Sequence, residues 1–285
     1  MFEILRKSLA TGVVTTSYPE APAAISSNAR GRPEIDFVQW KDARPAATIC
    51  PTGAIACADA DGTRTATLDL GLCIFCGLCA DVDTAIRMTN SCELAARRRG
   101  DLRTTAKYRL RPDGTHETFL TKFSEPDEQG PSTTLVRQSV EAVGGQLQKK
   151  INKVLGRSLH IREVDAGSCN GCEIEIVGLN SPVYDIERFG IHFVASPRHA
   201  DMLLVTGPVS RNMEVALRKT YDAMPAPRLV VAVGACGCSG GIFGQNYASL
   251  GGVDNVLPVD VYIPGCPPNP HPLLRGILMA ISRME

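Results

Sequence analysis

The chain has 285 residues, and its 30 lysines and arginines balance 30 aspartates and glutamates, so the formal net charge is +0. This balance gives no general reason to expect binding to nucleic acid or to an anionic membrane surface. No apolar run approaches the roughly 18 residues that a membrane span needs, and the first residues lack the apolar core of a signal peptide. We therefore expect a cytoplasmic protein without a membrane span of its own. Its 11 cysteines then indicate metal ligands and spare thiols rather than disulfides.

Residues 1–35 are predicted to form a short helix followed by an extended arm. Phe2, Leu5 and Leu9 recur at helical spacing. Such a helix packs either on its own domain or on a partner's surface, and the pattern is too short to decide between them. From Tyr18 to Pro33 the chain holds Pro, Ser, Asn and Gly without periodicity, which is typical of an arm.

Residues 36–121 contain a cysteine run that predicts a ferredoxin-like α+β domain. Bacterial ferredoxins repeat C-x2-C-x2-C-x3-C-P, and the fourth cysteine of each run binds the cluster of the other run. The second run here keeps three cysteines, and the first run keeps only its fourth. One complete set therefore remains, which predicts a 4Fe-4S cluster on Cys50, Cys73, Cys76 and Cys79.

The ligand positions of the other ferredoxin cluster are lost together. They hold Trp40, Ala43, Ala46 and Asp83. Because an empty cavity lowers stability, we expect the tryptophan and the alanines to fill the vacated space. Asp83 is expected to be a polar surface or capping residue rather than a residual iron ligand. A zinc-bound or degenerate ferredoxin fold stays open as an alternative.

Residues 97–134 indicate an exposed basic segment, a hairpin and a domain boundary. Seven arginines and lysines between Arg97 and Arg111 lack an aromatic platform, so a solvated face or a subunit contact is favoured over nucleic-acid binding. Alternation around Asp113 and Gly114 predicts a β-hairpin. Residues 122–156 are predicted to be a linker with a connecting helix, because apolar residues recur at steps of three or four after Val136.

Residues 157–285 are predicted to form a doubly wound α/β domain with a mostly parallel sheet. The apolar runs 159–164, 229–233 and 259–263 predict strands, and a glycine-containing loop with a cysteine follows each run. Helices are expected over 211–224, with Ser210 as N-cap, and over 272–284. Ligands bind at the carboxyl edge of such sheets. That edge is expected to carry one metal site made of Cys169, Cys172, Cys236 and Cys266.

An iron-sulfur cluster is the favoured metal centre at this edge. Structural zinc sites usually combine short-spaced pairs, whereas here a single C-x2-C pair is completed by two distant cysteines. Cys57 and Cys92 fit neither set and are expected to be spare thiols. Cys238 stands two residues from Cys236 and is either an exchangeable ligand or a neighbour that tunes the cluster by a weak hydrogen bond.

Three motifs resemble one known family. Ser168-Cys-Asn-Gly-Cys-Glu173, Gly234-Ala-Cys236 and Pro264-Gly-Cys266-Pro-Pro are similar to the small, cluster-bearing subunit shared by energy-converting nickel-iron hydrogenases and respiratory complex I. Complex I subunits have two adjacent cysteines at the first motif, so the spaced pair favours the formate hydrogenlyase and hydrogenase-4 branch. Residues 7–33 resemble the start of the formate hydrogenlyase polyferredoxin subunit. The resemblance thus implies a fusion of two subunits.

The resemblance implies an electron-transfer subunit of a membrane-associated, energy-converting hydrogenase, with two 4Fe-4S clusters. The cluster of the second domain would be proximal to a large subunit that holds the catalytic centre, which is either nickel-iron or complex I D-subunit-like. Other peripheral and membrane subunits would place the chain on the cytoplasmic face of the inner membrane. Glu173 is either a proton relay or an acid favoured by a helix N-terminus. A related complex acting on quinone and a zinc-binding assembly protein are the alternatives.

Overall fold

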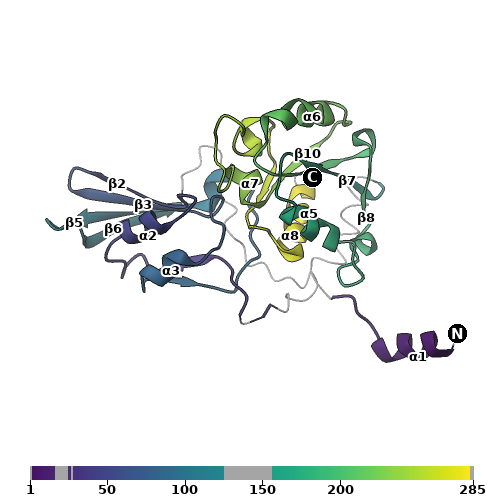
Figure 1. Cartoon of the computed structure of the whole chain (residues 1–285), viewed down its shortest axis with the longest axis horizontal. Helices are drawn as coiled ribbons and strands as arrows, with labels where there is room; N and C mark the ends of the chain where they lie inside the picture. The colour runs from purple at the N-terminus through teal and green to yellow at the C-terminus, as the bar shows by residue number, and fades with distance from the viewer. Residues whose placement is uncertain (1, 17–24, 27, 125–155, 283–285) are drawn as a thin grey trace.

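A computed structural model describes residues 2–16, 25–26, 28–124 and 156–282. Two bodies with separate sheets make up most of it, as Figure 1 shows. We call residues 28–124 the antiparallel unit and residues 156–282 the parallel unit. The predicted connecting helix, which would begin near Val136, falls within residues 125–155, and these lie outside the described residues.

The predicted N-terminal helix is present as α1 (Phe2–Thr11). None of its residues is buried, and Phe2 and Leu9 are 90% and 77% exposed. The helix extends away from both units in Figure 1. The chain after it docks on the parallel unit, because Thr16 donates its backbone N–H to the Val183 carbonyl (2.7 Å). The apolar side of α1 is therefore not packed on the described part of this chain.

The antiparallel unit combines a strand pair with a four-stranded sheet. β1 pairs antiparallel with β4, and the larger sheet has the antiparallel order β2-β3-β5-β6. β1 lies inside the range predicted as an arm, and β5 and β6 form the predicted hairpin. The elements are β1 (Pro33–Ile35), α2 (Arg44–Ile49), β2 (Ile55–Ala60), β3 (Thr63–Asp69), α3 (Leu78–Val82), β4 (Ile86–Met88), a 3-10 turn η1 (Arg99–Leu102), β5 (Arg103–Leu110) and β6 (His116–Ser124).

The parallel unit is a five-stranded sheet of order β11-β10-β9-β7-β8, in which every neighbouring pair is parallel. The three predicted strands are present, and β8 and β9 are additional. The elements are β7 (Leu159–Asp165), α5 (Gly171–Gly178), η3 (Ile186–Phe189), β8 (Ile191–Phe193), η4 (Pro197–His199), β9 (Met202–Thr206), α6 (Arg211–Asp222), β10 (Leu229–Val233), α7 (Gly234–Ser239), η5 (Val253–Asn255), β11 (Val261–Ile263) and α8 (Pro270–Ile281).

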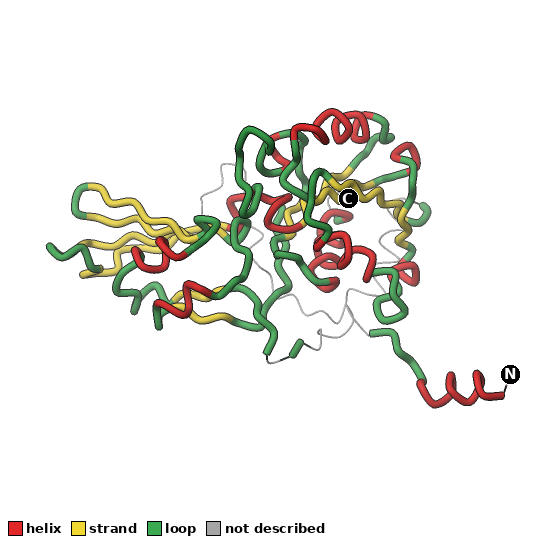
Figure 2. The backbone as a smooth tube through the Cα atoms, in the orientation of Figure 1, coloured by secondary structure: helices red, strands yellow, loops and turns green. Residues whose placement is uncertain are grey.

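Helices cover both faces of this sheet (Figure 2). Alternate residues of β9 point to opposite faces, as strand geometry requires. Leu203 packs in the same core as Leu217 of α6, while Leu204 shares the other core with Ile176 of α5 and Leu274 of α8. This arrangement confirms the predicted α/β class with a parallel sheet.

The two predicted helices of the parallel unit, α6 and α8, differ in how their N-terminal ends are capped. α6 begins after Ser210 as expected, but the Ser210 side chain makes no capping hydrogen bond. α8 begins at Pro270, earlier than predicted, because the Asn269 side chain accepts a hydrogen bond from the backbone N–H of His271.

One hydrophobic core runs through both units. It holds Trp40 and Tyr108 of the antiparallel unit together with Leu203 of the parallel unit. Ala96 and Tyr262 exchange two backbone hydrogen bonds (2.7 and 2.9 Å), so residue 96 extends the free edge of β11. The two units are therefore joined by side-chain packing and by backbone pairing. No helix within the described ranges is long and apolar enough to cross a membrane.

Candidate metal centres

The first two cysteines of the edge site lie in a tight turn between β7 and α5. The Asp165 carboxylate accepts hydrogen bonds from the backbone N–H groups of Gly167 (2.8 Å) and Ser168 (2.7 Å), which fixes the start of the turn. Asn170 has a positive φ of 69°, and α5 starts at the next residue. Asparagine tolerates this left-handed conformation better than most residues. The turn places Cys169 and Cys172 at the carboxyl edge of the sheet.

The loops after β10 and β11 bring the other two cysteines to the same place. Ala235 donates its N–H to the Gly265 carbonyl (2.7 Å), which joins these two loops. A Cβ atom on Gly234 would lie 2.6 Å from the Cys172 sulfur, so only glycine allows this close approach. Burial, followed by the neighbouring Cys266 and Cys169, raises the pKa of Cys236 to about 11. The four predicted cysteines therefore gather at one edge.

Cys238 does not face this group. It is fully buried, and its thiol donates a long hydrogen bond (3.8 Å) to the Ala232 carbonyl of β10. Its thiol is thus engaged with the sheet backbone rather than with a sulfur of the edge site, which corrects the expectation that it tunes a cluster by a hydrogen bond. Of the two, Cys236 is the cysteine that lies beside the other three.

Several exposed apolar residues lie close in sequence to the cysteines of the edge site. Cys169 and Cys266 are exposed. On α5, directly after Cys172, Ile174 and Val177 are 65% and 69% exposed. Exposed apolar residues also follow Cys236 in the chain, at Ile242, Phe243 and Tyr247. Clustered exposed apolar groups mark surfaces that bind other proteins.

The second cysteine group lines a cavity in the antiparallel unit. Cys50 ends α2, and the other three cysteines surround Gly77, whose φ of 89° lets the chain turn into α3. The remaining wall is mostly apolar. The lining residues are Pro33, Cys50, Pro51, Thr52, Ala54, Ile55, Leu68, Cys73, Ile74, Cys76, Gly77, Cys79 and Met88.

Burial has a strong effect on one thiol of this cavity. It is the main cause that raises the pKa of Cys73 to about 12; the N–H of Phe75 acts in the opposite direction, and the neighbouring Cys79, Cys50 and Cys76 contribute to the rise. That N–H donates to the Cys73 sulfur (3.4 Å). Because metals bind thiolates, these thiols must lose their protons when a metal enters.

Four thiols in a mostly apolar cavity, with an N–H···S hydrogen bond at Cys73, are the donors and surroundings that Fe-S clusters use. The residues of the cavity group therefore fit such a cluster by donors and surroundings, and those of the edge site fit it by their four thiols. In the part of the chain that the structure describes, no group of three or more His, Cys, Asp or Glu side chains is arranged to hold a single metal ion.

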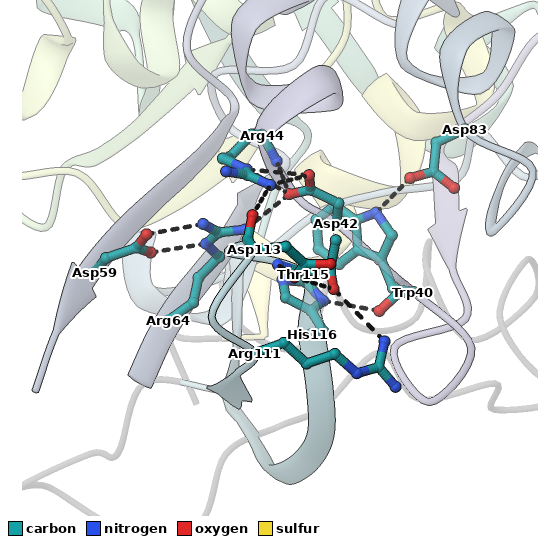
Figure 3. A network of polar contacts seen from close by, with 10 residues as sticks. All are labelled: Trp40, Asp42, Arg44, Asp59, Arg64, Asp83, Arg111, Asp113, Thr115 and His116. Atoms are coloured by element: carbon teal, nitrogen blue, oxygen red, sulfur yellow. Dashed lines mark hydrogen bonds and ion pairs between the residues drawn. The ribbon is translucent and has the colours of Figure 1, made fainter. Parts of the chain in front are cut away.

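The structure describes all four predicted ligand positions of the second cluster, and Figure 3 shows two of them, Trp40 and Asp83. Trp40 is 2% exposed, and Ala43 and Ala46 are fully buried. The indole N–H of Trp40 donates to one carboxylate oxygen of Asp83 (2.8 Å), and the other oxygen accepts from the N–H of Ala85 (2.9 Å). The tryptophan and the two alanines are therefore buried as expected, and Asp83 binds the tryptophan and a turn.

His116 supports Trp40, although its sequence context indicates no role for it. Its Nδ1–H donates to the Trp40 carbonyl (2.7 Å), and its ring stacks on Tyr108 with centroids 3.8 Å apart. Its Nε2 is buried without a hydrogen-bond partner among the described residues. Burial lowers the pKa of His116, which favours the neutral imidazole in the folded protein.

Acidification is expected to destabilise the folded chain through His116. The pKa is lowered on folding, so below the ordinary value of 6.5 the unfolded chain binds a proton that the folded chain excludes. Stability should fall with decreasing pH, by at most about 1.4 kcal/mol per pH unit for one proton. Urea unfolding of the wild type and of His116→Asn between pH 5 and 8 measures how much His116 contributes to the pH dependence of the free energy of unfolding. The asparagine side chain keeps a donor for the Trp40 carbonyl but does not titrate. Identical pH slopes for both proteins would contradict this assignment.

Glu173 lies next to Cys172 in the first turn of α5. Both of its carboxylate oxygens are buried, and neither has a hydrogen-bond partner among the described residues. It lines a hollow together with Arg162, Glu163 and Asn180. Burial, and then the charge of Glu173, raises the pKa of Glu163. Sequence reasoning missed Glu163, because a single acid within a strand carries no motif.

Residues 169–280 match the protein family described as "NADH ubiquinone oxidoreductase, 20 Kd subunit". Formate hydrogenlyase subunit 7 of Escherichia coli is 48% identical over 155 residues, which cover 54% of this chain and 59% of that protein. The probable membrane-bound hydrogenase subunit mbhJ of Pyrococcus furiosus is 44% identical over 142 residues, 49% of this chain and 85% of that protein. An NADH-quinone oxidoreductase subunit of Desulfovibrio desulfuricans is 49% identical over 138 residues, 48% of this chain and 73% of that protein.

These relatives are subunits of hydrogenase, formate hydrogenlyase and NADH-quinone oxidoreductase complexes. The matched range contains all four cysteines of the edge site and most of the parallel unit. Because the chain covers most of the mbhJ protein at 44% identity, it belongs to the family of the NADH ubiquinone oxidoreductase 20 Kd subunit.

Proposed function

We propose that this chain is the electron-transfer subunit of a membrane-associated, energy-converting hydrogenase of the formate hydrogenlyase type. In this proposal a ferredoxin-like unit is fused to a hydrogenase small-subunit unit. The first would hold a 4Fe-4S cluster on Cys50, Cys73, Cys76 and Cys79, and the second a proximal 4Fe-4S cluster on Cys169, Cys172, Cys236 and Cys266. The order β1-α2-β2-β3-α3-β4, with β1 beside β4, supports a ferredoxin-like unit that begins at Pro33.

The observation that carries this proposal is the placement of the two cysteine groups. Cys73 lies two residues after Gly71, whose carbonyl accepts a hydrogen bond from Ser239 of the parallel unit (2.8 Å). Cys236 lies three residues before Ser239. Trp40 lies instead beside His116, the first residue of β6, close to the turn between β5 and β6 (Figure 3). Of the two predicted cluster positions in the antiparallel unit, the one that keeps its four cysteines is therefore the one next to the parallel unit. Electron transfer between two clusters requires them to lie close together, so this placement supports the proposal.

Iron-sulfur clusters take up and release single electrons when bound. The residues of this chain would hold the clusters in surroundings that set their potentials, through burial and through the N–H of Phe75 on the Cys73 sulfur. The exposed apolar surface beside Cys169 and Cys266 would be covered by a large subunit that holds the catalytic centre. Other subunits would fix the chain to the cytoplasmic face of the inner membrane.

Glu173 is proposed as a proton relay at this covered surface. A carboxylate close to a redox centre can pass protons to or from a partner's active site. Both Glu173 oxygens are buried without a hydrogen-bond partner among the described residues, and Glu173 is adjacent to Cys172 of the edge site. The alternative role is stabilisation of the first turn of α5 by its charge.

Metal analysis of anaerobically purified chain tests the proposal. We expect about eight iron and about eight acid-labile sulfide per chain, from two four-iron centres, and two interacting EPR signals after reduction. About four of each would remove one of the two clusters from the proposal. Zinc without iron in a colourless protein would support the zinc-binding assembly role instead.

A complex I-like role with quinone or another acceptor is the second candidate, supported by the 49% identity to the NADH-quinone oxidoreductase subunit of Desulfovibrio desulfuricans. In that case the chain would carry the same two clusters, and only the large subunit would differ. Nickel in the co-purified large subunit supports the hydrogenase, and its absence from an active, quinone-reducing complex supports the second candidate.

A further inference from the structure

Arg99 connects the two units at a point between the two cysteine groups. Its Nη1 and Nη2 donate to the two carboxylate oxygens of Asp69 (2.6 and 2.9 Å), and its Nε donates to the backbone carbonyl of Cys238 (3.0 Å). The Asp69 and Arg99 side chains are 6% and 15% exposed. One guanidinium thus binds both units in a largely water-excluded place.

On the antiparallel side, this contact fixes the loop that leads to Cys73. Asp69 is the last residue of β3, and its carboxylate also accepts from the N–H of Gly71 (2.9 Å). A Cβ atom on Gly71 would lie 2.5 Å from the guanidinium carbon of Arg99, so Arg99 lies flat against this glycine. The loop and the arginine are therefore fitted to each other.

On the parallel side, the contact fixes α7, which carries Cys236. Cys238 and Ser239 follow it in the same helix. Ser239 adds a second hydrogen bond across the boundary, to the Gly71 carbonyl (2.8 Å). Cys73 and Cys236 are therefore linked through a few residues and one hydrogen bond.

We infer that Arg99, seated on Gly71, is a positioning residue that fixes the distance and orientation between the two cysteine groups and so sets the rate of electron transfer between their clusters. The inference rests on the proposed function, because it needs both clusters. The planar guanidinium suits this role, since it binds a carboxylate with two parallel bonds and still has Nε for a third acceptor. Lysine offers one charged nitrogen and cannot hold all three oxygens in this fixed geometry.

Three variants of the full chain test the inference. Arg99→Met removes the hydrogen bonds of the guanidinium to Asp69 and Cys238 and leaves the Ser239 hydrogen bond to Gly71 in place. Gly71→Ala introduces a methyl group that displaces the guanidinium, and Gly71 has no positive φ that would strain an alanine. Arg64→Met is the matched control. Arg64 is also buried and binds the carboxylate of Asp59 through two hydrogen bonds (2.7 and 2.8 Å). Its second carboxylate partner is Asp42, and both aspartates lie within the antiparallel unit, so this arginine does not connect the two units.

The readout is the EPR spectrum of the fully reduced chain, with iron and sulfide measured on the same samples. We expect Arg99→Met and Gly71→Ala to keep the iron of both centres and the signal of each cluster, but to lose or alter the splitting caused by their interaction. The control should keep the wild-type splitting. The rate at which the second cluster is reduced in stopped flow should fall in Arg99→Met and Gly71→Ala only.

The two hypotheses fail in different ways. A wild-type chain without two interacting signals overturns the proposed function, and the inference with it. A wild-type chain with interacting signals whose splitting and inter-cluster rate are unchanged in Gly71→Ala overturns the inference alone. Equal changes in Arg64→Met would assign the effect to general destabilisation and would also overturn it.

Discussion

Replacing Cys236 with alanine is expected to remove one complete four-iron centre, whereas replacing Cys238 with alanine is expected to leave both. The two cysteines stand two residues apart in α7, but only Cys236 lies beside Cys266 and Cys169. The Cys238 thiol faces the Ala232 carbonyl in the core. Iron should therefore fall from about eight to about four per chain in Cys236→Ala. Iron and sulfide analysis of the anaerobically purified variants measures this difference.

The Cys238→Ala variant also serves as the control for folding. Its loss of a buried sulfur should lower the free energy of unfolding slightly without changing the metal content. Loss of a centre in Cys238→Ala, with full iron in Cys236→Ala, would reverse the ligand assignment.

Replacing Trp40 with alanine is expected to lower the free energy of unfolding by about 3–5 kcal/mol. Trp40 is 2% exposed and packs against Phe37, Tyr108 and His116 at centroid distances of 6.0, 6.3 and 5.9 Å. Its removal leaves a cavity and also deprives Asp83 of the indole N–H. Urea unfolding monitored by far-UV circular dichroism gives the value.

Trp40→Phe separates the two contributions. It keeps an aromatic ring in the core but removes the N–H donor to Asp83, so its cost should be well below that of Trp40→Ala. A loss of less than about 1 kcal/mol in Trp40→Ala would mean that this position does not support the core. It would then contradict our interpretation that side chains replaced a former cluster.

The strands and cysteine loops of the parallel unit could be predicted because local signals agree there. Leu229 to Val233 is an apolar run that ends at a glycine, and the run, the turn and the following cysteine all indicate the same edge. β8 (Ile191–Phe193) has only three residues and no cysteine loop after it, so it could not be recognised, whereas β11, equally short, lies within the predicted run 259–263 and is followed by Cys266.

Contacts between distant side chains were the part that the sequence could not reveal. The basic segment after Arg97 was expected to be a solvated face or a subunit contact, yet Arg99 is largely buried between the units. Nothing in a run of arginines distinguishes the one that pairs with a buried aspartate. The same limit applies to Glu163, which becomes notable only because α5 places Glu173 near it.

The pairing of Ala96 with Tyr262 has a consequence for how the chain folds as it is synthesised. Tyr262 is made long after residue 96 has left the ribosome. The strands β2 to β6 can pair early, because their partners are close in sequence. The backbone pairing at Ala96 must wait for β11, the last strand of the parallel sheet, so this connection between the two units cannot form until that strand has been translated.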